Sequence, residues 1–178
     1  LTYEYVTLEK LYDLGADVPK PHAAGENAII MDYLGDANLA APALNAVKLD
    51  HDEARRLFKR AIWNINLMLQ NDIIHGDLSA YNILYWQGDI TLIDFPQVTD
   101  PNSNSNARMI LERDCVRVCE YFASQGVQSN PKRMANALWE RYFGIDPEQF
   151  AADMSRFEVE EEDYDYDDTD GYAGDYDY

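Results

Sequence analysis

The spacing of apolar and polar residues predicts that helices make up most of the chain. Apolar side chains recur at close to the helical period in residues 3–14, and Gly15 follows where a helix commonly ends on a left-handed residue. Two more helices are predicted further along, over residues 107–124 and residues 131–143. The last of them begins at a proline and is followed by a glycine, which is the usual order at helix ends.

A longer helix is predicted to begin after Asp50. Glu53 follows Asp50 by three positions, which is the spacing of a capping box. Apolar residues then continue at helical spacing to about residue 70 and supply one face of the helix for burial.

Shorter apolar runs predict a few strands. Residues 18–21 (VPKP) should be extended, because each proline disfavours the helical conformation of the residue before it. The run in residues 27–34 predicts a buried strand. Residues 83–86 and 90–93 predict a hairpin that turns at residues 87–89. The expected fold class is therefore α+β, mostly helical, with one short hairpin.

Composition places most of the chain in the globular class but sets one end apart. The 178 residues are 47% hydrophobic, which suffices for one compact core. The formal charge is −19, and eleven Asp or Glu lie in residues 158–178, where tyrosines alternate with acids and no Lys or Arg occurs. We expect residues 151–178 to be disordered, either as a solubilising end or as a docking tail for a basic partner.

The charge and the cysteines also restrict the classes of function. The remaining residues 1–157 are acidic overall and form no broad basic patch, so direct DNA binding is not expected. No apolar run approaches the ~20 residues that span a bilayer. Cys115 and Cys119 fit a buried pair in a reducing compartment, so a cytoplasmic location is expected. Since the chain starts at Leu1 without a signal-peptide pattern, we expect that the N-terminal part of a longer protein is missing.

Polar residues of a kind that binds metal and phosphate interrupt an apolar stretch in residues 73–84 (IIHGDLSAYNIL). Asn82 follows Asp77 by five positions, and Asp94 ends the predicted hairpin. Because a hairpin returns the chain to its start, Asn82 and Asp94 should lie side by side, with Asp77 in the preceding loop. Such oxygen ligands suit Mg²⁺, and a carboxylate that does not bind the metal can orient a hydroxyl group. The stretch therefore predicts Mg²⁺-dependent phosphoryl transfer.

The same residues match the kinase catalytic loop, H-x-D-L-x-x-x-N followed by a hairpin and an aspartate, at every fixed position. The alternative is a polar loop with a capping asparagine. Three stretches make the likeness more specific: HGDLSAYNIL, LIDFPQ and LYDLGADVPKP resemble the RIO family of atypical protein kinases over residues 3–121. The resemblance implies that Asp77 is the catalytic aspartate and that Asn82 and Asp94 bind Mg²⁺. It also implies that Asp94 can take the phosphoryl group, as in an ATPase-like cycle.

The resemblance further implies an ATP site and assigns its residues. Glu4 corresponds to the helix glutamate that pairs with a phosphate-binding lysine, and Ser79 stands where common protein kinases carry a lysine, which weakens ordinary substrate phosphorylation. Asp114 either supports the catalytic loop or is a solvated helix charge. The remaining residues of the adenine pocket are Met31 at the back, Asp32 and Leu34 at the hinge, and Leu84 and Ile93 as floor and wall.

Some parts of a kinase are not found in the sequence. Gly76 replaces the arginine of H-R-D, and Pro96 replaces the glycine of D-F-G, as the RIO resemblance implies. A glycine-rich loop and a strand lysine do not occur, so we expect this chain alone to bind nucleotide weakly.

The sequence leaves three functions open. The first is a RIO-type serine/threonine kinase or ATPase that acts on a protein substrate or on itself, with the small ribosomal subunit precursor as an implied partner. The second is a small-molecule phosphotransferase of the aminoglycoside kinase type, and the third is a non-catalytic lobe that only binds. The predicted domains are the end of an N-terminal lobe (1–34), a kinase-like C-terminal lobe (35–150) and the acidic tail (151–178).

Overall fold

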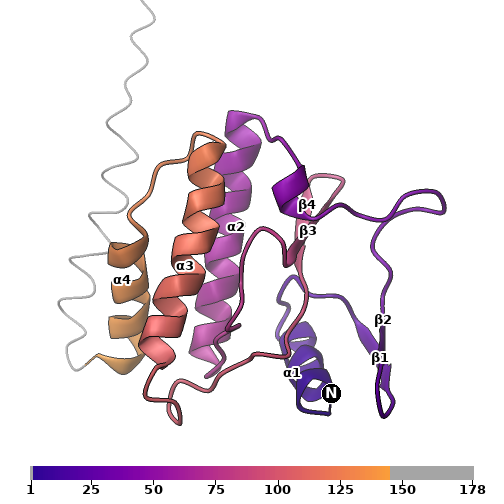
Figure 1. Ribbon diagram of the computed structural model, residues 1–178, viewed down its shortest axis with the longest axis horizontal. Coiled ribbons are helices and arrows are strands. Elements are labelled where there is room, and N and C mark those ends of the chain that lie inside the picture. Colours follow the sequence, from indigo (N-terminus) through magenta and orange to yellow (C-terminus); the bar gives the residue numbers. More distant parts are fainter. Residues whose placement is uncertain (1, 145–178) are drawn as a thin grey trace, which may run out of the picture.

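The computed structural model describes residues 2–144 and shows an α+β fold, as predicted (Figure 1). Its elements are, in order, α1 (Thr2–Asp13), β1 (Pro21–Ala24), β2 (Ile29–Met31), the 3₁₀ turn η1 (Leu44–Ala46), α2 (His51–Gln70), β3 (Ile83–Trp86), β4 (Asp89–Leu92), α3 (Ala107–Ser124) and α4 (Pro131–Phe143). The helices agree with the predicted ones to within a residue at each end. The acidic segment 151–178 lies outside the described residues, so its disorder and the domain division stay predictions.

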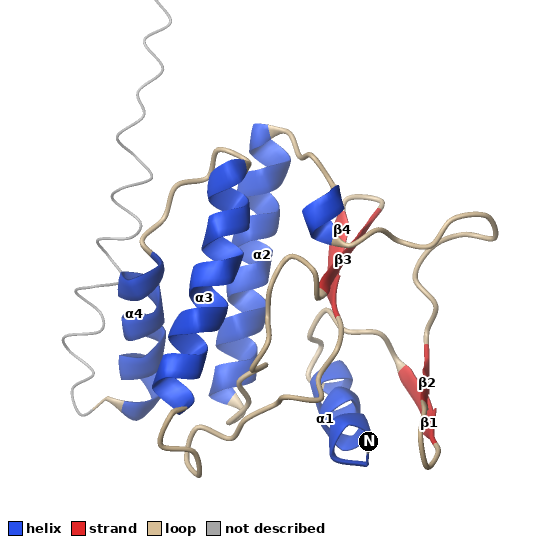
Figure 2. Cartoon of the chain, in the orientation of Figure 1, coloured by secondary structure: helices blue, strands red, loops and turns tan. Residues whose placement is uncertain are grey.

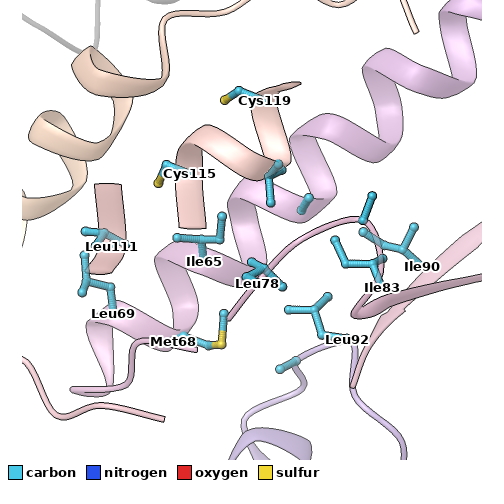
Figure 3. Packing of buried hydrophobic residues seen from close by; sticks show 14 of the residues in the cluster. Ile65, Met68, Leu69, Leu78, Ile83, Ile90, Leu92, Leu111, Cys115 and Cys119 are labelled. Atoms are coloured by element: carbon cyan, nitrogen blue, oxygen red, sulfur yellow. The ribbon is translucent and has the colours of Figure 1, made fainter. Parts of the chain in front are cut away.

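Three helices pack side by side on one side of the molecule. Figure 2 shows α2, α3 and α4 together, with the β3–β4 hairpin and α1 beyond α2 and α3. The apolar face of α2 packs against α3, where Leu69 and Ile65 lie near Leu111 and Cys115 (Figure 3). Hairpin residues such as Ile83 belong to the same core. Full burial of one such leucine or isoleucine contributes about 1.5–3 kcal/mol, so this core supplies most of the stability.

The start of α2 follows the predicted capping pattern in part. The Asp50 carboxylate accepts a hydrogen bond of 2.9 Å from the Glu53 amide, as an N-cap should. The Glu53 carboxylate accepts instead from the Tyr85 hydroxyl at 2.6 Å. The first turn of α2 is thereby attached to β3.

The β3–β4 hairpin differs from its prediction by one residue. Gln87 and Gly88 both have positive φ (51° and 91°), which makes the turn two residues long rather than three. The second strand therefore begins at Asp89 and not at residue 90. Ile83 pairs with Leu92, and both are buried.

The strand predicted within residues 27–34 is present as β2, but the prediction that it is buried is wrong. The strand β2 is only three residues long, pairs antiparallel with β1, and leaves 62% of Ile30 exposed. The β1–β2 pair stands away from α2, α3 and α4 (Figure 1), and Ile30 stays largely uncovered by the rest of residues 2–144. In α1, Leu8 and Leu11 are buried whereas Val6 is 53% exposed.

Two further sequence expectations can be compared with the described residues. Cys115 and Cys119 are free and buried, as predicted. Between residues 2 and 144, no helix is both long and apolar enough to cross a membrane.

Candidate active site

The loop that joins α2 to β3 is attached to the chain after β4. Ile74 and Thr99 exchange two backbone hydrogen bonds of 2.9 Å. His75 is 1% exposed, its Nε2 lies 3.1 Å from the Ile93 carbonyl oxygen, and its Nδ1 lies 3.3 Å from the Asp77 amide. Burial lowers the pKa of His75, so the ring is neutral and donates from Nε2 while Nδ1 accepts. His75 thus orients the loop.

A buried aspartate on α3 holds the same loop from the other side. Asp114 is 2% exposed, and its Oδ2 accepts a 2.8 Å hydrogen bond from the Gly76 amide. The neighbouring Arg113 donates to the Gly76 carbonyl. Burial raises the pKa of Asp114 to about 6, against the opposing effects of the Gly76 amide and the Arg113 charge. Of the two interpretations of Asp114, support of the catalytic loop agrees with this geometry, and the solvated helix charge is wrong.

The side chains of Asp77 and Asn82 lie together. The Asn82 side-chain amide donates to the Asp77 carbonyl oxygen at 2.9 Å and lies 3.3 Å from Asp77 Oδ2. Asp77 Oδ1 forms an ion pair with Arg117 Nη1 at 2.6 Å. The Asp77 carboxylate is therefore held at both oxygens.

Asp94 lies at the end of the hairpin, beside the Asn82 backbone. The amide of Ile93, the residue before it, donates to the Asn82 carbonyl at 3.0 Å. Asp94 itself is exposed and has a φ of 70°, a left-handed conformation that is uncommon for residues other than glycine. The negative charges of Asp94 and Asp77 both act to raise the pKa of His75 against the larger effect of burial.

The donor set near the hairpin end fits a Mg²⁺ ion. Within residues 2–144 no three His, Cys, Asp or Glu side chains gather as a metal site, but the predicted ligands are one carboxylate and one amide. Since the Asn82 amide nitrogen donates to the Asp77 carbonyl oxygen, its Oδ1 faces away from that contact, and it is the oxygen that the prediction assigns to the metal. Mg²⁺ commonly takes few protein oxygens and completes its shell with phosphate and water.

Other predicted residues lie on the same hairpin and loop. Leu84 in β3 and Ile93 after β4 are half-buried. Ser79 Oγ accepts from the Tyr81 amide at 3.3 Å. Ser79, Asp77, Asn82 and Arg117 are among the residues that line an open cavity of about 630 Å³.

The predicted hinge and the helix glutamate lie elsewhere. In β2 and just after it, the Asp32 amide donates to the Lys20 carbonyl and the Leu34 carbonyl accepts from the Ala41 amide. Glu4 is half-buried in the first turn of α1, and Met31 is 36% exposed. Across the described part of the chain, no hydrogen bond or ion pair joins these residues to Asp77, Asn82 or Asp94.

Sequence reasoning missed Arg113 and Arg117, which contact the loop from α3. Arg117 lies three positions after Asp114 and four after Arg113, and both spacings bring side chains together on one side of the helix. A sequence signal for them exists. Two arginines lie near the helix aspartate Asp114, which the family resemblance brings to a loop that carries an acidic residue, and arginines in that position can pair with the loop.

Comparison with known proteins decides the family. The sequence profile of the RIO domain matches residues 2–135. The chain belongs to the RIO family. Relatives of this RIO chain are named serine/threonine-protein kinases: the RIO-type kinase Rio1 of Thermoplasma acidophilum is 31% identical over 131 residues, which are 74% of this chain and 67% of that protein. RIO1 of Caenorhabditis elegans is 28% identical over 70% of this chain and 24% of that protein, and RIO3 of Mus musculus is 28% identical over 90% and 32%.

The match confirms the family resemblance seen in the sequence, and the family is one of kinases. The RIO chain spans only 43% of the related Rio1 of Haloferax volcanii and smaller shares of the animal proteins named above.

Proposed function

We propose that this RIO chain carries out Mg²⁺-dependent phosphoryl transfer from ATP, as the kinase-like C-terminal lobe of a serine/threonine kinase or ATPase. The observation that supports this most is the joining of Asp77 to Asn82 on a loop that α3 holds, with Asp94 at the adjoining hairpin end. These are the acceptor-orienting carboxylate and the two metal ligands that the reaction requires.

Each of these three residues has a distinct part in the proposal. Asp77 orients the acceptor hydroxyl and takes its proton, because its carboxylate is fixed by Arg117 and lines the open cavity. Asn82 and Asp94 hold the Mg²⁺ ion, which when bound neutralises charge on the phosphates. Asp94 is also the residue that would accept the phosphoryl group in an ATPase-like cycle.

The nucleotide would lie between the β1–β2 side of the molecule and the hairpin. At the hinge, the Asp32 amide and the Leu34 carbonyl form backbone hydrogen bonds within the protein. The groups that would bind adenine are the other two, the Asp32 carbonyl and the Leu34 amide. The side chains proposed around ATP are Met31 at the back, Leu84 and Ile93 against the base, Ser79 near the transferred phosphate, and Glu4, whose lysine partner this sequence does not contain.

The proposal also covers the phosphoacceptor, the assembly on which the protein acts and its location in the cell. The acceptor is a protein substrate or the enzyme itself, and the small ribosomal subunit precursor is the assembly on which it acts, in the cytoplasm.

Binding of ATP with and without Mg²⁺ tests the proposal. By calorimetry we expect this chain to bind Mg²⁺-ATP weakly and a protein extended at the N-terminus to bind it more tightly, since the phosphate-binding lysine is absent here. In the extended protein, Asn82→Ala and Asp94→Asn should each weaken Mg²⁺-ATP binding about tenfold or more, or ~1.4 kcal/mol. When ATP binding is measured in excess EDTA, without free Mg²⁺, the same two substitutions should change the affinity little.

Asp13→Asn is the matched control, because this exposed residue ends α1 and lies in no part of the proposed site. Equal affinity of the short and extended proteins would contradict the expected weakness of this chain. Unchanged Mg²⁺-ATP affinity in both site variants would contradict the metal assignment.

A further inference from the structure

The open cavity beside the catalytic loop (residues 76–82) contains the residue that an acceptor would have to meet, Asp77. The cavity measures about 630 Å³ and lies between this loop, the 3₁₀ turn η1 and α3. The loop contributes Asp77 and Tyr81 to its lining, and α3 contributes Arg117, Glu120 and Tyr121. An acceptor that enters here therefore meets side chains of α3 as well as the loop.

The walls of this cavity are bonded to one another. The Asn45 amide in η1 donates to the Ala80 carbonyl of the loop at 3.0 Å. The Tyr121 hydroxyl on α3 donates to the Val47 carbonyl, just after η1, at 3.1 Å. The loop is held to α3 through the ion pair of Asp77. Each wall thus contacts the other two, so the cavity belongs to the fold and is not a gap between loose segments.

The charges that line this cavity leave one acid without a counter-charge. Asp77 and Arg117 pair with each other at 2.6 Å. Glu120 is exposed, and among the described residues it forms no hydrogen bond or ion pair. Two cations of the same region, Arg113 on α3 and Lys48 shortly after η1, do not line the cavity. A ligand that fills the cavity can therefore place a positive charge at Glu120.

The same cavity has aromatic walls. Tyr81 is 70% exposed, and the hydroxyl of the half-buried Tyr121 is already used by a backbone carbonyl. A lysine or arginine side chain suits such a lining, because its aliphatic stem can pack on the rings while its charged end pairs with a carboxylate.

We propose that the acceptor is a serine or threonine of a protein segment that carries a lysine or arginine two positions away, and that Glu120 selects this cation. The hydroxyl would lie at Asp77 and the cation at Glu120. The inference rests on the proposed function, because it takes Asp77 as the residue that the acceptor meets.

The separation of two positions follows from the spacing on α3. Glu120 comes three positions after Arg117, which reaches Asp77, so it lies about 4.5 Å further along the helix axis. In an extended segment, neighbouring residues point to opposite sides, whereas residues two positions apart share a side and lie about 6.6 Å apart. A long, flexible cationic side chain can make up the difference.

The charge of the molecule favours the same kind of acceptor. Even without the eleven acids of residues 158–178, the formal charge of residues 1–157 is −8, so a basic segment is attracted and an acidic one is repelled. An aminosugar also combines hydroxyl groups with cations. Because the proposed acceptor is a protein, a peptide is favoured over an aminosugar.

Peptide binding to the full chain in the absence of nucleotide tests the proposal. By fluorescence anisotropy, a peptide whose serine has lysines two positions to either side is compared with a peptide that has glutamines there. We expect Glu120→Gln to weaken binding of the lysine peptide about two- to fivefold, as for an exposed ion pair, and to leave binding of the glutamine peptide unchanged.

Glu112→Gln is the matched control, because it removes the same charge from α3 at a residue that pairs with Lys132 instead. It should leave the binding of both peptides unchanged. Equal effects of the two substitutions on the lysine peptide, or no effect of either, would overturn the proposal.

Amide resonances of the full chain give the location of the bound peptide. This matters because the eleven acids of residues 158–178 can attract lysines by charge alone. We expect the Ala80 and Glu120 amides to shift when the lysine peptide is added. Shifts confined to residues 158–178 would overturn the proposal, as would shifts of the two amides with the aminosugar kanamycin but with neither peptide. Since no nucleotide is present, failure of Mg²⁺-ATP binding would count against the proposed function and not against the selection by Glu120.

Discussion

At the scale of single residues, the candidate site depends on the buried Asp114, whose two carboxylate oxygens differ in their hydrogen bonding. Asp114 Oδ2 receives the Gly76 amide, but Oδ1 has no hydrogen-bond partner among the described residues, and the Arg113 guanidinium lies 3.7 Å from it. A buried, half-satisfied carboxylate favours its protonated form. The pKa of about 6 therefore has a visible cause.

The pH dependence of stability should report this group. Because the folded-state pKa is raised from 3.8 to about 6, folding favours the proton, and the contribution of Asp114 to stability is lost as pH rises from about 4 to about 6. The Asp114→Asn variant lacks this pH-dependent loss of stability, because an amide does not titrate. We expect the unfolding free energy of the wild type, relative to the variant, to fall by about 2–3 kcal/mol between pH 4 and pH 7, as measured by urea denaturation.

Gly76 should be the least replaceable glycine of the loop. Its φ is +84°, and an added Cβ would overlap the Gln97 carbonyl oxygen. Gly15 has nearly the same φ, +81°, with nothing within 4 Å of an added Cβ. By thermal denaturation we expect Gly15→Ala to cost about 1 kcal/mol, from backbone strain alone, and Gly76→Ala at least ~2 kcal/mol. Equal losses would mean that contact with Gln97 is unimportant.

At the scale of elements, the helices were predictable and the exposed strand pair was not. The helical period and the capping residues are local signals, so α2 begins and ends where Asp50 and the apolar pattern indicate. The burial of β2 depends on what lies opposite it in space. Ile29 packs against the core while Ile30 faces solvent, and an apolar run in the sequence does not distinguish the two.

The cap of α2 gives a prediction for an element. Asp50→Ala removes the acceptor of the Glu53 amide and should lower the unfolding free energy by about 1 kcal/mol, seen as a lower midpoint in urea. Asp52→Ala is a suitable control, because the Asp52 side chain is fully exposed in the same turn and loses only weak interactions with the helix dipole and with His51 Nδ1, 3.9 Å away, so its effect should be clearly smaller.

At the scale of the whole molecule, the site could be predicted as far as chain connectivity defines it. Asn82 and the backbone just before Asp94 meet because one hairpin joins them, and Asp77 lies five positions before Asn82 in the same loop; both relations can be read from the sequence. Arg117 reaches Asp77 from forty residues away, through the packing of α3, and spacing along the chain does not reveal such a contact.

The molecule also exposes apolar side chains on α1 and β2, where Val6 is 53% and Ile30 is 62% exposed. Such side chains favour association between copies. We expect Ile30→Thr to reduce concentration-dependent association in sedimentation velocity while changing the unfolding free energy by no more than ~0.5 kcal/mol. Ile29→Thr, at the half-buried neighbour, should instead destabilise the fold.

Because the Gly76 amide donates to Asp114, the exchange rate of its proton reports how often the loop separates from α3. This proton is enclosed between a loop and α3, so it can reach solvent only when the two separate. Its hydrogen–deuterium exchange should be as slow as that of amides in the middle of α3, although it belongs to a segment without regular secondary structure.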